Sequence, residues 1–196
     1  MLGSRDLDRA DAVALELAPH APRGRVRGGL NLQVALQAEV PFITVPYPAQ
    51  RELLTALQKP LAGKVVVSTA IPLAFARGQA RAVPVKEGSA AQEAQALLPR
   101  SKVVSAFQNL SAHDLLVPDR ALEADVVVCA DDPEAKRLVM ALAEAIAGVR
   151  AIDGGGLENA RYVEELTALL LNLNRIYKGS RTMIRIVGLN GKPGAS

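Results

Sequence analysis

The 196-residue sequence is poor in the residues that form metal centres and disulfides. Cys129 is its only cysteine, so no internal disulfide can form. The two histidines, His20 and His113, lie at no metal-ligand spacing from a thiol or from each other. Tryptophan is absent, and aromatic residues make up 3% of the chain. The sequence therefore predicts a protein without a metal site, and its cysteine usage is typical of the cytoplasm.

Long apolar runs are also absent. No run approaches the roughly 18 residues of a membrane span, and Arg5 and Asp6 place charges where a signal peptide is apolar. Apolar residues make up 49% of the chain and charged residues 22%, which is close to the average for soluble globular proteins. We expect one cytoplasmic domain over residues 1–196 that makes no contact with a membrane.

The chain has only a small excess of positive charge, with a formal net charge of +3. Proteins that bind nucleic acids concentrate lysine and arginine on one face, and binders of single strands add aromatic side chains. The basic clusters here are Arg23, Arg25 and Arg27, and then Arg175, Lys178, Arg181 and Arg185. We interpret both as solvated surface, with a docking surface for a small anionic ligand as the alternative. No nucleic-acid partner is predicted.

Helical patterns alternate with short β-branched runs along the chain. Residues 6–17 have apolar residues at helical spacing, and the run KVVVS at 64–68 is a strand that is apolar on both faces. Further strands are expected at 40–45, 102–106, 125–129 and 151–153, and a short first strand is expected before Gly3-Ser4-Arg5. Further helices are expected at 31–39, from 48 onward, at 89–99 and at 132–147. Strands apolar on both faces indicate a parallel sheet covered by helices on each side, a doubly wound α/β fold.

The last expected helix, over residues 158–177, is unusually apolar. Between Leu166 and Leu173 it is apolar nearly all round, which predicts burial on several faces. The sheet or a second subunit could cover it, so a homodimer through this C-terminal helix is one of two open alternatives.

Doubly wound sheets bind ligands beyond the carboxyl ends of their strands. The first such end is Gly3-Ser4-Arg5. In dinucleotide-binding folds an acid at this place holds the ribose 2′-hydroxyl, whereas an arginine accepts a 2′-phosphate. Arg9 lies one helical turn farther on. In the alternative interpretation Ser4 caps the helix and Arg5 pairs with a neighbouring carboxylate.

The other strand ends combine apolar walls with a few polar donors. Residues 44–48 could line an apolar nucleotide slot or form a rigid loop, and 68–72 and 106–110 are typical of a small-molecule pocket. The glycines of 154–156 precede a helix, but Asn159 stands where a phosphate-binding pattern needs its third glycine, which favours a tight turn. No G-x-S-x-G pattern is present, so acyl transfer is not supported.

In this order the segments resemble the NADPH-dependent coenzyme F420 reductases. The similarity extends from residue 2 to about residue 188. The matching runs are GSR at 3–5, TVP at 44–46, KVVVS at 64–68, GSAA at 88–91, KVVSAFQN at 102–109, DVVVCADD at 125–132, IDGG at 152–155, NAR at 159–161 and ELT at 165–167.

The resemblance implies a Rossmann-like fold and direct hydride transfer between NADP(H) and the deazaflavin coenzyme F420, with the two rings stacked in an apolar cleft. No acid–base residue is then required, because the chemistry belongs to the cofactors. The residues implied at the 2′-phosphate are Ser4, Arg5 and Arg9, and those along the nucleotide are Thr44, Val45, Pro46 and Tyr47. Those implied at the ring cleft are Ser68, Ile71 and Pro72, then Gln108, Asn109 and Leu110 where the cofactors meet, and Gly154, Gly155 and Thr167 on the deazaflavin side.

The chain departs from the family pattern at its start. Family members open with a strand and a glycine-rich turn that receives the pyrophosphate, and this chain begins after both, with Gly3 as its first glycine. In the usual strand order the missing strand is central, so we expect an N-terminally truncated sheet in two halves. Residues 179–183 also differ from the expected pattern, which affects closure on the substrate side.

Three explanations of this start remain open. The start codon could be assigned too far downstream. The short chain could be a catalytically inactive homologue that acts as a binding or dimerisation module. Alternatively, Leu2 and its neighbours could pack against residues 40–45 and leave a weak nucleotide site. Reduction of another small substrate by NADPH, such as an imine, is a further alternative activity.

Overall fold

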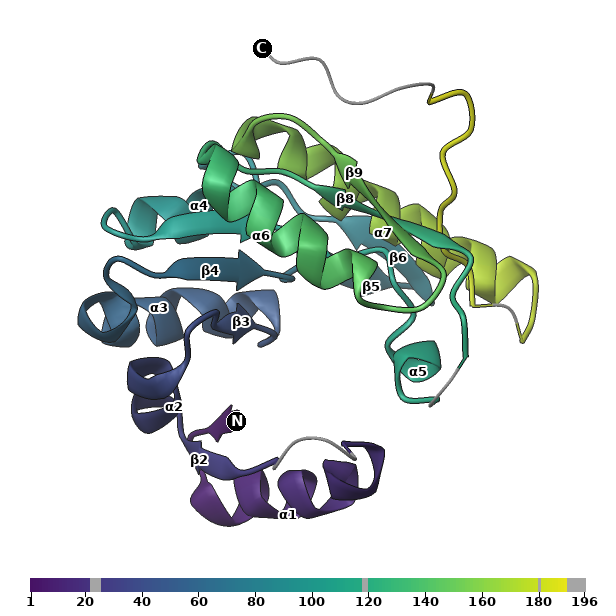
Figure 1. Ribbon diagram of the computed structural model, residues 1–196. Coiled ribbons are helices and arrows are strands. Elements are labelled where there is room, and N and C mark those ends of the chain that lie inside the picture. The colour runs from purple at the N-terminus through teal and green to yellow at the C-terminus, as the bar shows by residue number, and fades with distance from the viewer. Residues whose placement is uncertain (22–25, 118–119, 180, 190–196) are drawn as a thin grey trace.

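A computed structural model describes residues 1–21, 26–117, 120–179 and 181–189 (Figure 1). The strands are β1 (Leu2–Ser4), β2 (Gly28–Leu30), β3 (Phe42–Ile43), β4 (Val65–Ser68), β5 (Leu73–Ala76), β6 (Gln79–Ala82), β7 (Lys102–Ser105), β8 (Ala124–Val128) and β9 (Val149–Asp153). The α-helices are α1 (Leu7–Leu17), α2 (Asn31–Gln37), α3 (Tyr47–Leu61), α4 (Ala90–Leu97), α5 (Ala112–Leu115), α6 (Pro133–Glu144) and α7 (Ala160–Ile176). Of the residues named above, Arg23, Arg25 and Ser180 lie outside the described part.

The strands form a mostly parallel arrangement, as predicted. β3, β4 and β7 make a three-stranded parallel sheet, and β1–β2 and β8–β9 are parallel pairs. An antiparallel bridge between Ser105 and Cys129 joins the end of β7 to the end of β8. The expected α/β fold is therefore confirmed.

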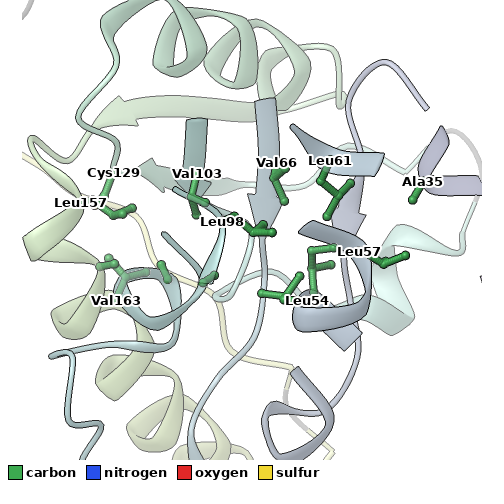
Figure 2. Close-up of a cluster of buried hydrophobic side chains, with 14 residues drawn as sticks. Ala35, Leu54, Leu57, Leu61, Val66, Leu98, Val103, Cys129, Leu157 and Val163 are labelled. Carbon is green, nitrogen blue, oxygen red and sulfur yellow. The ribbon is translucent and has the colours of Figure 1, made fainter. Parts of the chain in front are cut away.

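Successive valines of β4 and β7 face two separate cores, because side chains alternate across a strand. Val66 and Val103 pack in a cluster with the leucines of α3 and α4, and Figure 2 shows these side chains converging. Val67 and Val104 point into the second cluster, which includes Val139 and other residues of α6. Helices thus cover both faces of the sheet, which explains why these strands have no polar face.

The N-terminal unit of β1, α1, β2 and α2 forms its own small layer (Figure 1). β1 pairs with β2, and the hydrogen-bonded sheet of β3, β4 and β7 begins separately. The expected division of the sheet into two halves is thus confirmed within the described residues. Leu2 is in register with Gly28, and no strand pairing joins β1 to β3 within the described residues, so strand pairing does not support the alternative in which Leu2 and its neighbours pack against residues 40–45.

The predicted starts of α4 and α6 are confirmed by the hydrogen bonds of their capping side chains. The Ser89 hydroxyl accepts a hydrogen bond from the backbone N–H of Gln92 at 3.0 Å, and the Asp132 carboxylate accepts one from Ala135 at 2.8 Å. Both satisfy N–H groups that a first helical turn leaves unpaired.

Strand lengths and the hairpin differ from the predictions. The strand expected at 40–45 is only Phe42–Ile43, and Pro41 directly before it lacks an N–H for the ladder. The β5–β6 hairpin is absent from the prediction. Its turn places Arg77 at φ 52° and Gly78 at φ 74°, and only the glycine is a usual signal for that conformation.

The last helix is less buried than its composition indicated. A 3₁₀ turn at Leu157–Asn159 precedes α7, and α7 packs against β6 and α4. Its opposite side leaves Leu169 53% exposed and Ile176 66% exposed, so the expected burial on several faces is incomplete in this chain alone. In the part of the chain that the structure describes, no helix is both long and apolar enough to span a membrane.

Lys64 ties the N-terminal unit to the rest of the fold. Its Nζ donates to the backbone oxygens of Ala35, Leu36 and Ala38, at 2.7, 2.8 and 2.8 Å. These oxygens lie at the C-terminal end of α2, where the helix leaves carbonyls unpaired and favours a cation.

Lys64→Met should therefore lower the free energy of unfolding by about 2 kcal/mol, the scale of a hydrogen bond to a charged group. Urea unfolding measures this loss. Lys59→Met is the control, because Lys59 is an exposed lysine in the last turn of α3 and should cost less than about 0.5 kcal/mol. Equal losses in the two variants would contradict a role for the three carbonyl contacts.

Candidate functional site

A cavity of about 630 Å³ opens between the N-terminal unit and α3. Its walls come from β1, α1 and α2 on one side and from the end of β3 and α3 on the other. Six of the sequence-predicted site residues line it: Ser4, Arg5, Arg9, Thr44, Val45 and Pro46. Its volume is within the range of small-molecule sites. A second cavity of about 650 Å³ continues along the same gap and shares Leu2, Gly3 and Thr44 with the first.

The side chains of Arg5 and Arg9 lie at the start of α1. The Asp6 carboxylate caps this helix and accepts hydrogen bonds from the N–H groups of Asp8 and Arg9, at 3.0 and 3.3 Å. The Ser4 hydroxyl instead accepts from Asp6 N–H at 3.1 Å, so Ser4 is not the helix cap. Arg5 therefore lies directly after β1, at the cavity wall.

Arg5 and Arg9 are exposed, and within residues 1–21, 26–117, 120–179 and 181–189 no carboxylate lies within 4.0 Å of either guanidinium. The alternative in which Arg5 pairs with a neighbouring acid is thus not seen. Glu52 is the acidic residue among those lining this cavity, so its lining carries an excess of positive charge. An anionic group would be favoured at this end.

The next part of the site is the row formed by the carboxyl ends of β3, β4 and β7. Ile43 of β3 is in register with Ser68 of β4, and Ser68 with Ser105 of β7. Thr69 donates to the Ile43 carbonyl from its N–H at 3.2 Å and from its hydroxyl at 3.1 Å. The carboxyl ends of β3, β4 and β7 therefore lie side by side, as parallel strands require.

A hydrogen-bonded turn follows β7 at the far end of this row. Gln108 Nε2 donates to the Ser68 carbonyl at 3.2 Å and to Ser105 Oγ at 2.6 Å, while Thr167 Oγ1 of α7 donates to the Gln108 carbonyl at 3.3 Å. Asn109 Nδ2 donates to the carbonyl of Asp125 in β8 at 2.6 Å. Four sequence-predicted residues, Ser68, Gln108, Asn109 and Thr167, thus meet through contacts between segments far apart in sequence.

The turn leaves polar atoms without partners. Ser68 Oγ, Gln108 Oε1 and Asn109 Oδ1 are buried and have no hydrogen bond within the described residues. Each such atom is costly in a closed interior, by about 1–3 kcal/mol. Leu110 packs partly buried against the core that contains α6.

Other predicted residues lie outside these two groups. The pKa of Tyr47 is raised by its partial burial and by the nearby carboxylates of Glu93 and Glu87. Pro72 lines a small pocket beside Ser89, and Ile71, directly before it, is half-buried. A cofactor contact by these residues stays a prediction.

Gly154 and Gly155 follow β9 and pack tightly. A Cβ on Gly154 would lie 2.5 Å from Cys129 Sγ, and Gly155 has φ 83°. The Gly154 carbonyl accepts from Asn159 Nδ2 at 2.8 Å. These contacts support the interpretation of the glycines as a tight turn, and their place at the deazaflavin side stays a prediction.

Sequence reasoning missed the α3 face of the cavity. Ala49, Glu52, Leu53 and Ala56 line it at helical spacing. The spacing was visible in the sequence, but a leucine at such a position is compatible with a core as well as with a pocket wall. Asn31 at the start of α2 also lines the cavity and was not predicted as a site residue.

Glu164 is a buried carboxylate that connects α7 to the start of α4. It accepts from the N–H groups of Ala90 and Ala91 at 2.8 and 3.1 Å and is 3% exposed. Burial raises the pKa of Glu164 to about 7, and the charge of Glu165 adds to this, while the two N–H donors lower it. It lies one turn before Thr167, which contacts the Gln108 turn.

Glu164 should therefore make the fold less stable as pH rises. Its proton contributes stability that is fully present below pH 4.5 and is lost as pH rises through about 7. Relative to Glu164→Gln, the unfolding free energy of the unmodified chain should fall by roughly 3 kcal/mol across this window. Urea unfolding at both ends of the window measures it, with the exposed neighbour variant Glu165→Gln as control. A parallel pH dependence in the Glu164→Gln variant would contradict this assignment.

Comparison with known proteins agrees with this geometry. The F420-dependent NADP reductase of Methanocaldococcus jannaschii is 38% identical over 195 residues, which cover 96% of this chain and 87% of the relative. The enzyme of that name from Methanothermobacter marburgensis is 37% identical with the same coverage. The chain belongs to the F420-dependent NADP reductase family.

Two solved structures are also similar to this chain. A candidate F420-dependent NADP reductase from Arthrobacter sp. FB24 superposes with a TM-score of 0.81 at 27% identity, covering 95% of this chain and 87% of that one. A hypothetical protein from Sinorhizobium meliloti, at 23% identity and a TM-score of 0.63, shares the fold; the alignment covers 80% of this chain and 75% of that one. No family model matches the sequence.

Proposed function

We propose that this chain transfers a hydride between NADP(H) and the deazaflavin coenzyme F420. The observation that carries the proposal is the position of Arg5 and Arg9 at a cavity between β1 and α3, in a chain 38% identical to an F420-dependent NADP reductase. A guanidinium can bind a phosphate with two parallel hydrogen bonds. The nucleotide's 2′-phosphate is the group that fits this end of the cavity.

The residues present fit a nucleotide. Among the residues that the structure describes, Arg5 and Arg9 have no carboxylate partner within 4.0 Å, and Ser4 adds a hydroxyl on the same wall. Val13, Val45 and Leu53 give the cavity apolar walls suited to a planar base. Thr44, Val45 and Pro46 would border the nucleotide along its length, and Tyr47 follows them at the start of α3.

At the end of the site where the two rings would meet, the protein has to position the cofactors, and no acid–base residue is required. When bound, reduced nicotinamide supplies the hydride and the deazaflavin accepts it. The protein's part is to hold the two planes together and exclude water, since alignment of reacting atoms is worth several orders of magnitude in rate. Ser68, Ile71 and Pro72 would form one side of that cleft, and Gln108, Asn109 and Leu110 its floor, with Gly154, Gly155 and Thr167 toward the deazaflavin.

The test is an absorbance assay with purified chain, NADPH and oxidised F420. Turnover should appear as loss of absorbance at about 420 nm, the wavelength that names the coenzyme. Substituting NADH for NADPH should abolish most of the rate because Arg5 and Arg9 then have no 2′-phosphate to bind. Absence of any turnover with either nucleotide would overturn the proposed function.

We also propose that a second copy covers the exposed side of α7, giving a homodimer. Tyr162, Leu169 and Ile176 of α7 are more than half exposed, which is unusual for apolar residues on one helix. Sedimentation velocity should show a dimer that Leu169→Lys converts to monomer. Leu15→Lys on α1, at a leucine that is 76% exposed, is the control and should leave the dimer intact.

A further inference from the structure

The turn after β7 is held by hydrogen bonds to β4, β7, β8 and α7. Phe107 has φ 72°, a left-handed conformation that is costly for a bulky side chain. Such a residue persists only where the surrounding structure determines its backbone conformation. Here the determining contacts are the hydrogen bonds of Gln108 and Asn109, the two residues that follow.

Gln108 is placed to set the spacing of two strands. Its Nε2 group uses both hydrogens internally, one on the Ser68 carbonyl of β4 and one on the Ser105 hydroxyl of β7. The side chain is buried, and the residue is 5% exposed. A side chain committed in this way has no N–H left with which to bind a cofactor.

We infer that Gln108 is a positioning residue, which fixes the carboxyl ends of β4 and β7 relative to each other and holds the strained turn on which the two rings meet. This inference rests on the proposed function and refines the predicted contact of Gln108 with a cofactor. Thr167 supports the same turn from α7 by donating to the Gln108 carbonyl. The effect on hydride transfer is therefore exerted through the backbone of residues 105–110.

The opposite end of β7 offers a matched control. Gln95 Nε2 donates to the carbonyls of Leu98 and Ser101, both at 3.0 Å, and its Oε1 accepts from Val103 N–H at 3.0 Å. Gln95 is thus a second internally bonded glutamine against the same strand, at the end away from the proposed ring cleft. Methionine has nearly the volume of glutamine and makes none of these bonds.

The experiment compares Gln108→Met with Gln95→Met in the full chain. Gln108→Met should reduce kcat for F420 reduction roughly 10- to 100-fold, the scale of a misplaced reacting pair. Its dissociation constant for NADPH should stay within about 3-fold, because Arg5 and Arg9 are unchanged. Gln95→Met should leave kcat within about 3-fold at a comparable loss of stability.

Hydrogen–deuterium exchange without ligands gives a second readout. Gln108→Met should accelerate exchange of the amides of residues 105–110 about 10-fold, whereas Gln95→Met should accelerate exchange near residues 98–103. Unchanged exchange at 105–110 would overturn the positioning role whether or not the unmodified chain transfers hydride. A Gln108→Met chain with normal kcat and weakened NADPH binding would also overturn it, since that result indicates direct contact. If the unmodified chain does not reduce F420, that result contradicts the proposed function and leaves the positioning role of Gln108 to be judged by the exchange experiment.

Discussion

Arg5→Glu should reduce the preference for NADPH over NADH by roughly 10- to 150-fold, which corresponds to 1.5–3 kcal/mol for a hydrogen bond to a charged group. Arg5 follows β1 directly and lines the cavity without a carboxylate within ion-pair distance among the described residues. Glutamate removes the guanidinium and places a negative charge beside a dianionic phosphate. NADH lacks that phosphate, so its affinity should change little. Titration calorimetry with both nucleotides measures the two dissociation constants.

Arg100→Glu makes the same change of charge at a site far from the cavity. Arg100 is exposed and precedes β7, so it stands at the amino ends of the strands. This control should alter the NADPH-to-NADH ratio less than about twofold at physiological salt. If Arg5→Glu behaves like Arg100→Glu, Arg5 is a surface residue and the nucleotide assignment is wrong.

Asp125→Ala should lower the free energy of unfolding by about 3 kcal/mol. The Asp125 carboxylate is fully buried and accepts from Arg150 Nε and Nη2 at 2.9 and 2.7 Å, and from Ile186 N–H at 2.6 Å. Burial alone would raise its pKa, but the hydrogen bonds from Arg150 and Ile186 and the charge of Arg185 lower it below the ordinary value. Alanine would leave Arg150 without its carboxylate partner and Ile186 N–H without its acceptor, while the backbone bond from residue 125 N–H to the Ile184 carbonyl at 2.8 Å remains.

Urea unfolding at neutral pH measures this loss, and Asp132→Ala is the control. Asp132 caps α6 and pairs with Lys102 at 2.9 Å, but it is partly exposed, so its loss should cost about 1 kcal/mol. Because the pKa of Asp125 is lowered, its contribution should be present above pH 3.8 and should disappear as pH falls below that value. Equal losses for the two variants at neutral pH would show that Asp125 does not hold the C-terminal segment.

Local signals in the sequence were sufficient for the elements that local physics determines. The start of α6 follows from Asp132 and Pro133, and the valines of β4 indicate a strand covered on both faces. The β5–β6 hairpin was not predictable in this way. The side chain of Asn172 in α7 stabilises the hairpin, because it accepts from the Ala80 N–H and donates to the Ala80 carbonyl, both at 2.9 Å. The two residues are 92 positions apart in the sequence.

In the candidate site, too, the parts that depend on local sequence could be predicted and the parts that depend on long-range contacts could not. The place of Arg5 could be predicted because β1, the turn and α1 are consecutive in sequence, and Arg5 lines the cavity there; nucleotide binding by Arg5 stays a prediction. The internal use of the Gln108 amide could not be predicted, because it depends on the register of Ser68 with Ser105. The capping role of Glu164 likewise depends on how α7 packs on α4.

Transfer of deuterium from NADPH labelled at the reactive nicotinamide carbon tests the central claim most directly. If the protein only aligns two rings, with no acid–base group between them, the label should move from the nucleotide to the deazaflavin without passing through water. Mass spectrometry of the reduced coenzyme would then show one deuterium when NADPH carries it on the transferred face. Deuterium recovered in the solvent, with unlabelled reduced coenzyme, would contradict direct transfer.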